Sequence, residues 1–298
     1  MANKNLSKAK TAKNDEFYTQ YKDIESELSH YAAWFNGKRV LANCDDYRVS
    51  NFVKYFIDNY WELGLTSFTA VCYDNGTGAW KMDYDGNVQS IKPLQQNGDF
   101  RSPESIELLQ QCDVVVTNPP FSLFREYIAQ LIEYGKYFLV LGNNNAVTYK
   151  EIFPLIKNNQ MWLGYSANKT MEFEVPEGYT FSREDENGKK YGKVPAITWF
   201  TNIPTTKRSE KLILGKKYKP EEYPHYDNYD AIEVSKVVDI PVDYEGVMGV
   251  PITFLDKYCP EQFEIVELPN TSIPGVIKNA EGKIGNRITY ARVLIKKK

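Results

Sequence analysis

The stretch that decides the fold is Asp113-Val114-Val115-Val116-Thr117-Asn118-Pro119-Pro120-Phe121. Its apolar half is a short run of β-branched residues, which is typical of a strand that is buried on both faces of a sheet. The two prolines fix φ and remove two backbone donors, so the strand has to end there in a rigid turn. The stretch therefore predicts a buried strand that stops at a polar corner.

The same unit of apolar strand, polar turn and helical spacing recurs on both sides of this stretch. Strands are expected at residues 39–42, 67–73, 113–116, 137–141 and 196–201, and helices at residues 50–57, 103–111 and 124–134. Ser50 and Ser102 stand where they can cap the first two helices. Strands that alternate with helices in this way imply an α/β fold with a doubly wound, mostly parallel, Rossmann-like sheet.

Polar residues gather where the expected strands end. Ligands of such sheets bind outside the carboxyl ends of the strands. In this chain those ends are residues 43–46, Asp74, residues 118–121 and residues 143–145. We therefore predict a binding site at this edge of the sheet.

The composition is ordinary for a globular protein. The 298 residues carry a net charge of −3 and are 42% hydrophobic and 25% charged, which is too apolar for a disordered chain. No apolar run is long enough to cross a bilayer, and the first residues lack the apolar segment of a signal peptide. Four scattered cysteines and two histidines argue against a disulfide framework and a metal site. We expect a cytoplasmic protein that binds neither a membrane nor a metal.

The pattern changes after residue 150. Residues 184–190 resemble an exposed hairpin tip, a lysine-rich stretch opens at about residue 205, and shorter β-like segments follow. We expect two domains, residues 1–204 and residues 205–298, of which the second is a smaller α+β region. Residues 1–13 carry four lysines and no acidic residue, which predicts a mobile basic arm.

The corner after the strand at residues 113–116 has the chemistry to hold a planar amine. The side-chain oxygen of Asn118 and the carbonyl of Pro119 can accept both hydrogens of such an amine, and Phe121 can stack on the ring that carries it. The N6 amine of adenine fits this description, and stacking on a base contributes about 1–3 kcal/mol. The alternative is a proline-rich loop that only terminates a strand.

Asn118-Pro119-Pro120-Phe121 is similar to the catalytic tetrapeptide of amino-group methyltransferases that use S-adenosylmethionine. Together with residues 13–20, 43–46, 50–52 and 249–258 it makes nearly the whole chain resemble the EcoRI-type adenine-specific DNA methyltransferase family. The resemblance implies a Rossmann-like methyltransferase sheet and methyl transfer to an adenine flipped out of duplex DNA. The implied catalytic residues are Asn118, Pro119, Pro120 and Phe121.

The resemblance also implies contacts to S-adenosylmethionine. Phe17, Tyr18 and Thr19 are expected against its methionine part, Asn43, Asp45 and Asp46 near its ammonium and carboxylate, and Asp74, Asp99 and Phe100 around its ribose and adenine. The chain departs from most methyltransferases because no glycine lies between Val40 and Phe52. Structural roles are the alternatives, as buried aromatics for the first set and as solvated turn residues for Asp74 and Asp99.

The substrate contacts are assigned by the resemblance and by charge. They are Trp199, Phe200, Lys207 and Arg208. The two aromatic residues are expected opposite Phe121, although core packing also explains them. The two cations open a basic stretch. This stretch, the basic arm and residues 292–298 are expected near DNA phosphates. A solvated surface explains each of the three segments equally well. Target recognition is assigned to residues 205–298.

The implied partner is duplex DNA. The protein is expected to act as a monomer, and a cognate restriction endonuclease could act separately. Two alternatives stay open. One is methylation of another planar amine, in RNA or in a protein glutamine, although those enzymes usually carry the glycine-rich turn that is missing here. The other is a DNA-binding relative that has lost catalysis.

Overall fold

The computed structural model describes residues 18–74, 78–167, 169–174, 182–194, 196–269, 281–289 and 291–298. The chain divides into two compact units, Met1–Asn144 with Gly164–Ile203, and Asn145–Leu163 with Pro204–Lys298. The second unit thus begins at Pro204 and also takes in residues 145–163, which the sequence analysis places in the first domain. Nothing in the composition of residues 145–163 indicates that they belong to the second unit. Their membership follows from contacts such as the one from the Lys157 ammonium to the Val266 carbonyl, at 2.7 Å.

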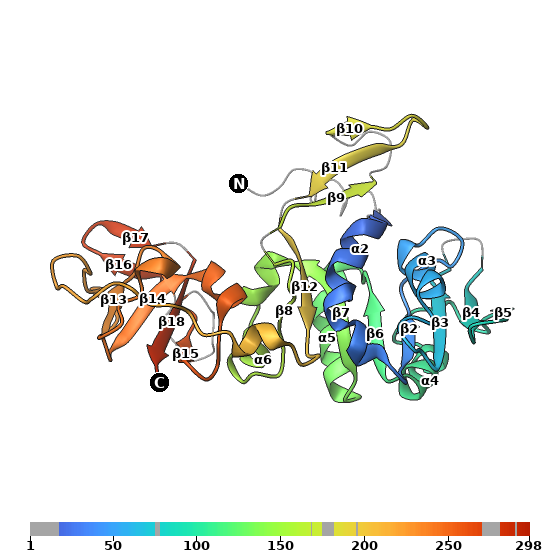
Figure 1. Ribbon diagram of the computed structural model, residues 1–298, viewed down its shortest axis with the longest axis horizontal. Helices are drawn as coiled ribbons and strands as arrows, with labels where there is room; N and C mark the ends of the chain where they lie inside the picture. Colours follow the sequence, from blue (N-terminus) through green and yellow to red (C-terminus); the bar gives the residue numbers. More distant parts are fainter. Residues whose placement is uncertain are drawn as a thin grey trace. The chain divides into compact units, whose positions relative to one another are not determined.

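The first unit is built on a mixed, mostly parallel sheet (Figure 1). Its strands are β2 (Arg39–Ala42), β3 (Ser67–Cys72), β4 (Trp80–Tyr84), β5 (Gln89–Pro93), β6 (Val114–Thr117), β7 (Tyr137–Asn143) and β12 (Ile197–Thr201). They lie in the order β5-β4-β3-β2-β6-β7-β12. The four central strands run parallel, and β12, β4 and β5 are antiparallel to their neighbours. The predicted α/β sheet is confirmed, and the residues after β3 form the β4–β5 hairpin.

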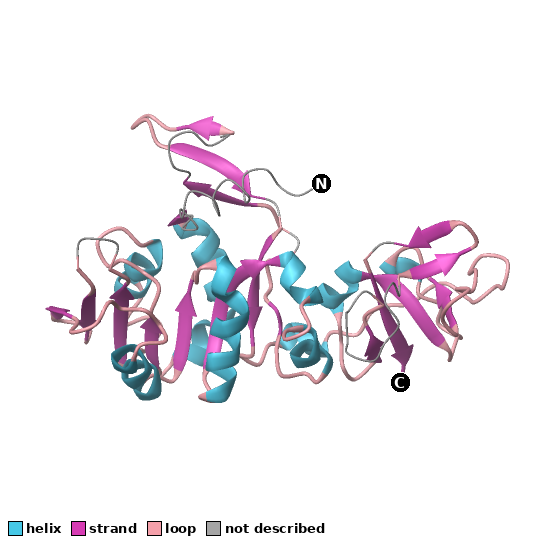
Figure 2. Ribbon diagram, turned by 180° about the vertical axis from the view of Figure 1, so that it is seen from behind, coloured by secondary structure: helices cyan, strands magenta, loops and turns pink. Residues whose placement is uncertain are grey.

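Helices pack on both faces of this sheet (Figure 2). They are α2 (Tyr21–Leu28), α3 (Asn51–Asp58), α4 (Pro103–Gln111) and α5 (Phe124–Glu133). Adjacent residues of β12 show the two layers, because Trp199 packs edge-to-face on Phe52 of α3 and Phe200 packs on Phe124 of α5. The side chains of Trp199 and Phe200 are both fully buried. The strand therefore alternates between two cores, as expected for a doubly wound sheet.

The helix starts agree with the capping residues in the sequence. The Ser50 hydroxyl accepts a hydrogen bond from the backbone N–H of Phe52 at 3.1 Å, and the Ser102 hydroxyl accepts one from Ser105 at 3.3 Å. Each bond satisfies one of the backbone donors left open at a helix N-terminus. The predicted helices at residues 50–57 and 103–111 are thus confirmed to within one residue.

A second sheet of the first unit has the order β1-β9-β11-β10. It consists of β1 (Tyr18–Thr19), β9 (Met171–Glu174), β10 (Arg183–Glu184) and β11 (Lys190–Val194). Strands β10 and β11 are antiparallel, which confirms the hairpin tip expected at residues 184–190. Thr19 pairs with Phe173, a residue of the main core, so this sheet is joined to the body of the unit.

The second unit is a small α+β body. Its sheet has the order β13-β14-β18-β15, with β13 (Ala231–Glu233), β14 (Val247–Pro251), β15 (Phe263–Glu267) and β18 (Arg292–Lys297). A separate hairpin joins β16 (Gly282–Ile284) to β17 (Arg287–Thr289), and the unit also holds α6 (Phe153–Lys157) and β8 (Trp162–Leu163). Arg292 pairs with the buried carboxylate of Glu233 at 2.6 Å, which ties β18 to β13 across the sheet.

Six short 3₁₀ helices connect these elements within the described residues. They are η1 (Ser29–Phe35), η2 (Phe121–Leu123), η3 (Asn144–Thr148), η4 (Thr206–Ser209), η5 (Val237–Asp239) and η6 (Ile252–Lys257). None of the helices that the structure describes has the length and apolarity that a membrane crossing requires.

Candidate active site

A cavity of about 250 Å³ opens where β2, β3 and β6 end. Its lining residues are Thr19, Asn43, Cys44, Asp45, Asp46, Ser50, Asn51, Phe52, Cys72, Tyr73, Gly98, Asp99, Phe100, Arg101, Asn118, Pro120 and Leu123. The cavity therefore lies at the edge of the sheet that the strand order predicts for a ligand. It brings together the turns after three parallel strands and the loop that leads into α4.

Asp45 is the centre of the turn after β2. Its carboxylate accepts hydrogen bonds from the hydroxyls of Ser50, at 2.6 Å, and Thr117. Its backbone N–H donates to the carbonyl of Val71 at 3.0 Å. These bonds hold the turn without glycine, because the side chain itself supplies the contacts that fix the backbone.

Asn43 is oriented by a fully buried tyrosine. The hydroxyl of Tyr127, on α5, donates to the side-chain oxygen of Asn43. Burial raises the pKa of Tyr127 far above its usual value, so the hydroxyl stays protonated and can only donate to that oxygen. The amide nitrogen of Asn43 is thereby left as the donor that the side chain can offer to the cavity.

The hydroxyl oxygen of Thr19 and the amide nitrogen of Asn43 are buried at the cavity and have no hydrogen-bond partner among the described residues. An unpaired buried polar group costs about 1–3 kcal/mol. The chemistry of these donors suits a ligand with acceptor groups, such as a carboxylate.

A third side chain of the turn, Asp46, is held by Arg48. The guanidinium donates to the two carboxylate oxygens at 2.6 and 2.8 Å. Burial acts to raise the pKa of Asp46, but the hydrogen bonds from Arg48 outweigh burial and the pKa lies below its usual value. Asp46 is therefore charged at neutral pH and lies in the wall of the cavity as an ion pair with Arg48.

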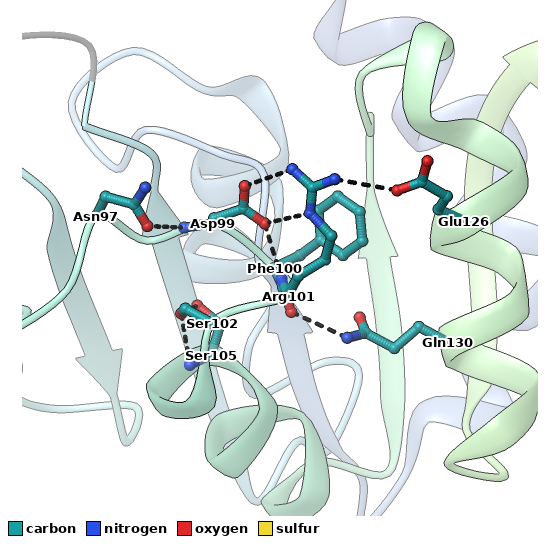
Figure 3. A network of polar contacts seen from close by, with 8 residues as sticks. All are labelled: Asn97, Asp99, Phe100, Arg101, Ser102, Ser105, Glu126 and Gln130. Atoms are coloured by element: carbon teal, nitrogen blue, oxygen red, sulfur yellow. Dashed lines mark hydrogen bonds and ion pairs between the residues drawn. The ribbon is translucent and has the colours of Figure 1, made fainter.

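Asp99 and Phe100 form another wall of the cavity, and Figure 3 shows the polar contacts around them. Arg101 pairs with both oxygens of Asp99, at 2.8 and 2.9 Å, and also reaches Glu126 on α5 at 3.0 Å. The hydrogen bonds from Arg101 hold the pKa of Asp99 below its usual value. The ring of Phe100 is buried and packs edge-to-face on Tyr127, with ring centroids 5.0 Å apart.

Gly98 lets this wall approach β3. Its φ is +71°, and a Cβ atom there would lie 2.5 Å from the carbonyl oxygen of Cys72. Any other residue would clash with that strand and would also be strained in the left-handed region. The close approach keeps Asp99 and Phe100 beside Cys72 and Tyr73 in the same cavity.

The Asn-Pro-Pro-Phe corner reaches the cavity through two of its residues. Asn118 and Pro120 are among the lining residues, Pro119 is buried, and Phe121 is half-buried against the main core. The carbonyl of Pro120 accepts from the backbone N–H of Leu123 at 3.0 Å, which begins η2. The corner is therefore a fixed wall of the cavity.

Comparison with known proteins identifies the family. Residues 5–298 match the family model for the adenine-specific methyltransferase EcoRI. The chain is 47% identical to the Type II methyltransferase M.EcoRI of Escherichia coli, over 99% of this chain and 97% of that one. It is also 40% identical to M.MpnI of Mycoplasma pneumoniae, over 98% of each chain, and 42% identical to M.MgeORF184P of Mycoplasma genitalium, over 98% of each chain.

The chain belongs to the EcoRI family of adenine-specific methyltransferases. It is an adenine-specific DNA methyltransferase, which confirms the family resemblance and the class of reaction expected from the sequence.

The structure of this EcoRI-family methyltransferase brings most of the predicted cofactor residues together. Thr19, Asn43, Asp45, Asp46, Asp99 and Phe100 line the cavity, whereas Phe17 and the side chain of Tyr18 lie outside the described residues. Asp74 follows the lining residue Tyr73 and does not itself line the cavity, and its carboxylate accepts from the backbone N–H of Gly78 at 2.9 Å. The cofactor role of each residue stays a prediction.

The predicted substrate residues of the methyltransferase are engaged in contacts of their own. Trp199 and Phe200 are fully buried and do not line the cavity. Lys207 pairs with Asp256, and the guanidinium of Arg208 lies 4.3 Å from the ring centroid of Trp162. The assignment of these four residues to substrate binding stays a prediction, and the structure accounts for each of them by packing or pairing.

Several residues of the site were not assigned a role from the sequence. They are Thr117, Tyr127, Gly98, Arg101 and Tyr73. The spacing of Tyr127 places it on the buried face of a helix, but nothing in a spacing identifies the partner of its hydroxyl. Tyr73 could have been found, because it is the last residue of a predicted strand.

Proposed function

We propose that this methyltransferase binds S-adenosylmethionine in the cavity and methylates N6 of an adenine flipped out of duplex DNA. The observation that carries the proposal is the shared cavity: Asn118 and Pro120 form one wall, and Asn43, Asp46 and Phe100 form others. A corner that can hold an amine therefore opens onto a space whose other walls suit an amino acid and a purine. This is the juxtaposition that methyl transfer between two bound molecules requires.

The cofactor supplies, when bound, a methyl group on a positively charged sulfur. The unpaired donors of Thr19 and Asn43 suit its carboxylate, and the charged carboxylate of Asp46 suits its ammonium. Phe100 offers a buried ring for its adenine, and Asp99 an acceptor for the amine of that adenine. The lining therefore matches the cofactor in chemical kind, because hydrogen-bond donors, a carboxylate and an aromatic ring line one cavity.

The catalytic corner acts by accepting hydrogen bonds. The side-chain oxygen of Asn118 and the carbonyl of Pro119 accept the two hydrogens of the target amine, which localises its lone pair on nitrogen. These dipoles are held in place before reaction by the prolines and by the bond from Thr117 to Asp45. Fixed dipoles aimed at developing charge lower the barrier without a covalent intermediate. Phe121 is assigned to the face of the target base.

DNA is bound as a duplex from which one base is extruded. The target atom is out of reach inside the helix, so the nucleotide has to flip out at a cost of a few kcal/mol. We assign target recognition to residues 205–298. We also expect a monomer that works in the cytoplasm, with any restriction endonuclease acting separately.

The test is methyl transfer to defined substrates. The purified protein is incubated with methyl-labelled S-adenosylmethionine and either unmethylated plasmid DNA, RNA or protein, and the plasmid is then sequenced with modified bases identified. We expect N6-methyladenine at one sequence context. Label in RNA or glutamine would contradict the proposal, and binding of DNA without binding of the cofactor would indicate a relative that has lost catalysis.

A further inference from the structure

The hairpin of β16 and β17 has a well-defined turn. Its two-residue loop is Gly285-Asn286, and φ at Gly285 is +56°. A glycine with positive φ at the first position is typical of type II′ turns, whose twist matches that of paired strands. The short ribbon from residue 282 to residue 289 is therefore specified by its own sequence.

Asp227 and Asn228 hold the first strand and the turn of the hairpin. The Asp227 carboxylate accepts from the backbone N–H of Gly285 at 2.7 Å. The Asn228 side chain donates to the Glu281 carbonyl at 2.9 Å and accepts from the N–H of Lys283 at 2.8 Å. These contacts hold the ribbon in one conformation, so little conformational entropy remains to be lost when a partner binds.

The outer part of the hairpin is exposed. Lys283 pairs across the strands with Ile288, which is 61% exposed, so both side chains project from the same face. Ile284 lies on the other face and packs against the cluster around Tyr226. Arg287 pairs with Ile284 and so stands on the face opposite Lys283, but Arg287 and Asn286, at the tip, are both exposed.

The two cations of the hairpin differ from four other cations of the second unit. Lys207, Lys216 and Lys219 pair with Asp256, Asp239 and Glu222, and Arg292 pairs with Glu233. In the part of the chain that the structure describes, neither Lys283 nor Arg287 lies within ion-pair distance of a carboxylate, and residues 282–289 include no acidic residue. The hairpin can therefore meet phosphates without breaking an existing ion pair.

We propose that the β16–β17 hairpin is a DNA-contacting element, with Lys283 and Arg287 on backbone phosphates and Asn286 on a base edge. The inference rests on the proposed function, since it takes duplex DNA as the substrate. The major groove admits a two-stranded ribbon, and an asparagine amide can both donate to and accept from adenine there. Each phosphate neutralised by a cation releases counterions and makes binding dependent on salt.

The test compares two double variants that remove the same charge from exposed positions. They are Lys283→Ala with Arg287→Ala, and as a matched control Lys22→Ala with Lys92→Ala, two exposed lysines of the first unit. Affinity for an unmethylated DNA duplex is measured by fluorescence anisotropy at several salt concentrations. We expect the hairpin variant to bind about 10-fold more weakly and to lose about 1.8 from the slope of log K against log salt, at about 0.9 per phosphate contact.

Three readouts separate the possible results. Methylation of DNA by the wild-type protein tests the proposed function, and its absence would contradict that function itself. A hairpin variant that binds and methylates DNA like the control, beside an active wild type, overturns the inference alone. Cofactor affinity and the melting temperature should be unchanged in the hairpin variant, since its side chains are exposed and distant in sequence from the cavity residues.

Asn286→Ala tests the base contact separately. Plasmid DNA methylated by this variant is sequenced with modified bases identified. We expect discrimination at one position of the recognition sequence to fall about 10-fold, within the range of a single base contact. An unchanged recognition sequence would contradict the assignment of Asn286 to a base edge.

Discussion

The hydroxyl of Thr117 donates a hydrogen bond to a carboxylate oxygen of Asp45. The other oxygen of that carboxylate accepts from Ser50, the N-cap of α3, at 2.6 Å. One buried side chain thus joins the turn after β2 to the start of a helix and to the residue that precedes Asn118. The cofactor side and the catalytic side of the cavity are therefore positioned by the same carboxylate.

Replacement of Thr117 by valine should impair both sides of the site. Valine keeps the shape of threonine and removes its hydroxyl, so one oxygen of the buried Asp45 carboxylate loses its donor. We expect the free energy of unfolding to fall by about 1–3 kcal/mol, with losses in both cofactor affinity and turnover. Urea denaturation, calorimetric titration and a methyl-transfer assay measure the three quantities.

Thr198→Val is the matched control for this substitution. Thr198 is also fully buried on a strand, and its hydroxyl has no partner among the described residues. Its replacement should leave stability unchanged or raise it. Equal losses in the two variants would mean that the bond from Thr117 to Asp45 contributes nothing specific.

Tyr127→Phe should weaken cofactor binding about 10-fold, which corresponds to about 1.4 kcal/mol. The substitution removes the hydroxyl that orients the Asn43 amide and leaves the ring that packs on Phe100. Tyr31→Phe is the control, because the Tyr31 hydroxyl donates to the buried carboxylate of Glu27 at 3.0 Å and neither residue lines the cavity. Both variants should lose stability, and only the first should lose cofactor affinity in calorimetric titration.

Gly98→Ala should destabilise the protein by more than its backbone strain alone. A Cβ atom at residue 98 would meet the Cys72 carbonyl at 2.5 Å, whereas one at Gly135, which also has positive φ, would have nothing within 4 Å. Strain in the left-handed region costs about 1 kcal/mol or more in each variant. Denaturant unfolding of Gly98→Ala and Gly135→Ala measures the loss of unfolding free energy in each variant. Equal losses would show that the structure around residue 98 shifts to accommodate the added Cβ atom.

The lowered pKa of Asp99 predicts that the free energy of unfolding depends on pH in the acid range. Its pKa is lowered from the usual value of 3.8 by hydrogen bonds from Arg101. A lowered folded-state pKa means that the stabilisation is complete above about 3.8 and is lost as the pH falls through the folded pKa. Asp99→Asn should therefore be less stable than the wild type at neutral pH, and the difference should shrink below pH 3.8. A difference that stays constant down to the acid transition would exclude this linkage.

The sheet could be predicted from the sequence because its signals are local. The apolar run before Asn118 and the capping serines Ser50 and Ser102 each act on neighbouring residues, and each is found where it was expected. The edge of the sheet that holds the cavity follows from the direction of the parallel strands.

The bonds inside the site could not be predicted, because each joins residues far apart in the chain. Thr117 and Asp45 are separated by 72 residues, and Tyr127 and Asn43 by 84. No spacing in the sequence encodes such a pair. The same holds for residues 145–163, whose membership of the second unit depends on contacts that only the folded chain provides.

The central claim is that Asn118 holds the target amine. The most direct measurement is methyl transfer by Asn118→Ala to unmethylated plasmid DNA, with cofactor affinity measured on the same preparation. We expect transfer to be abolished while the cofactor dissociation constant stays within a few fold of the wild type. Turnover close to that of the wild type would contradict it.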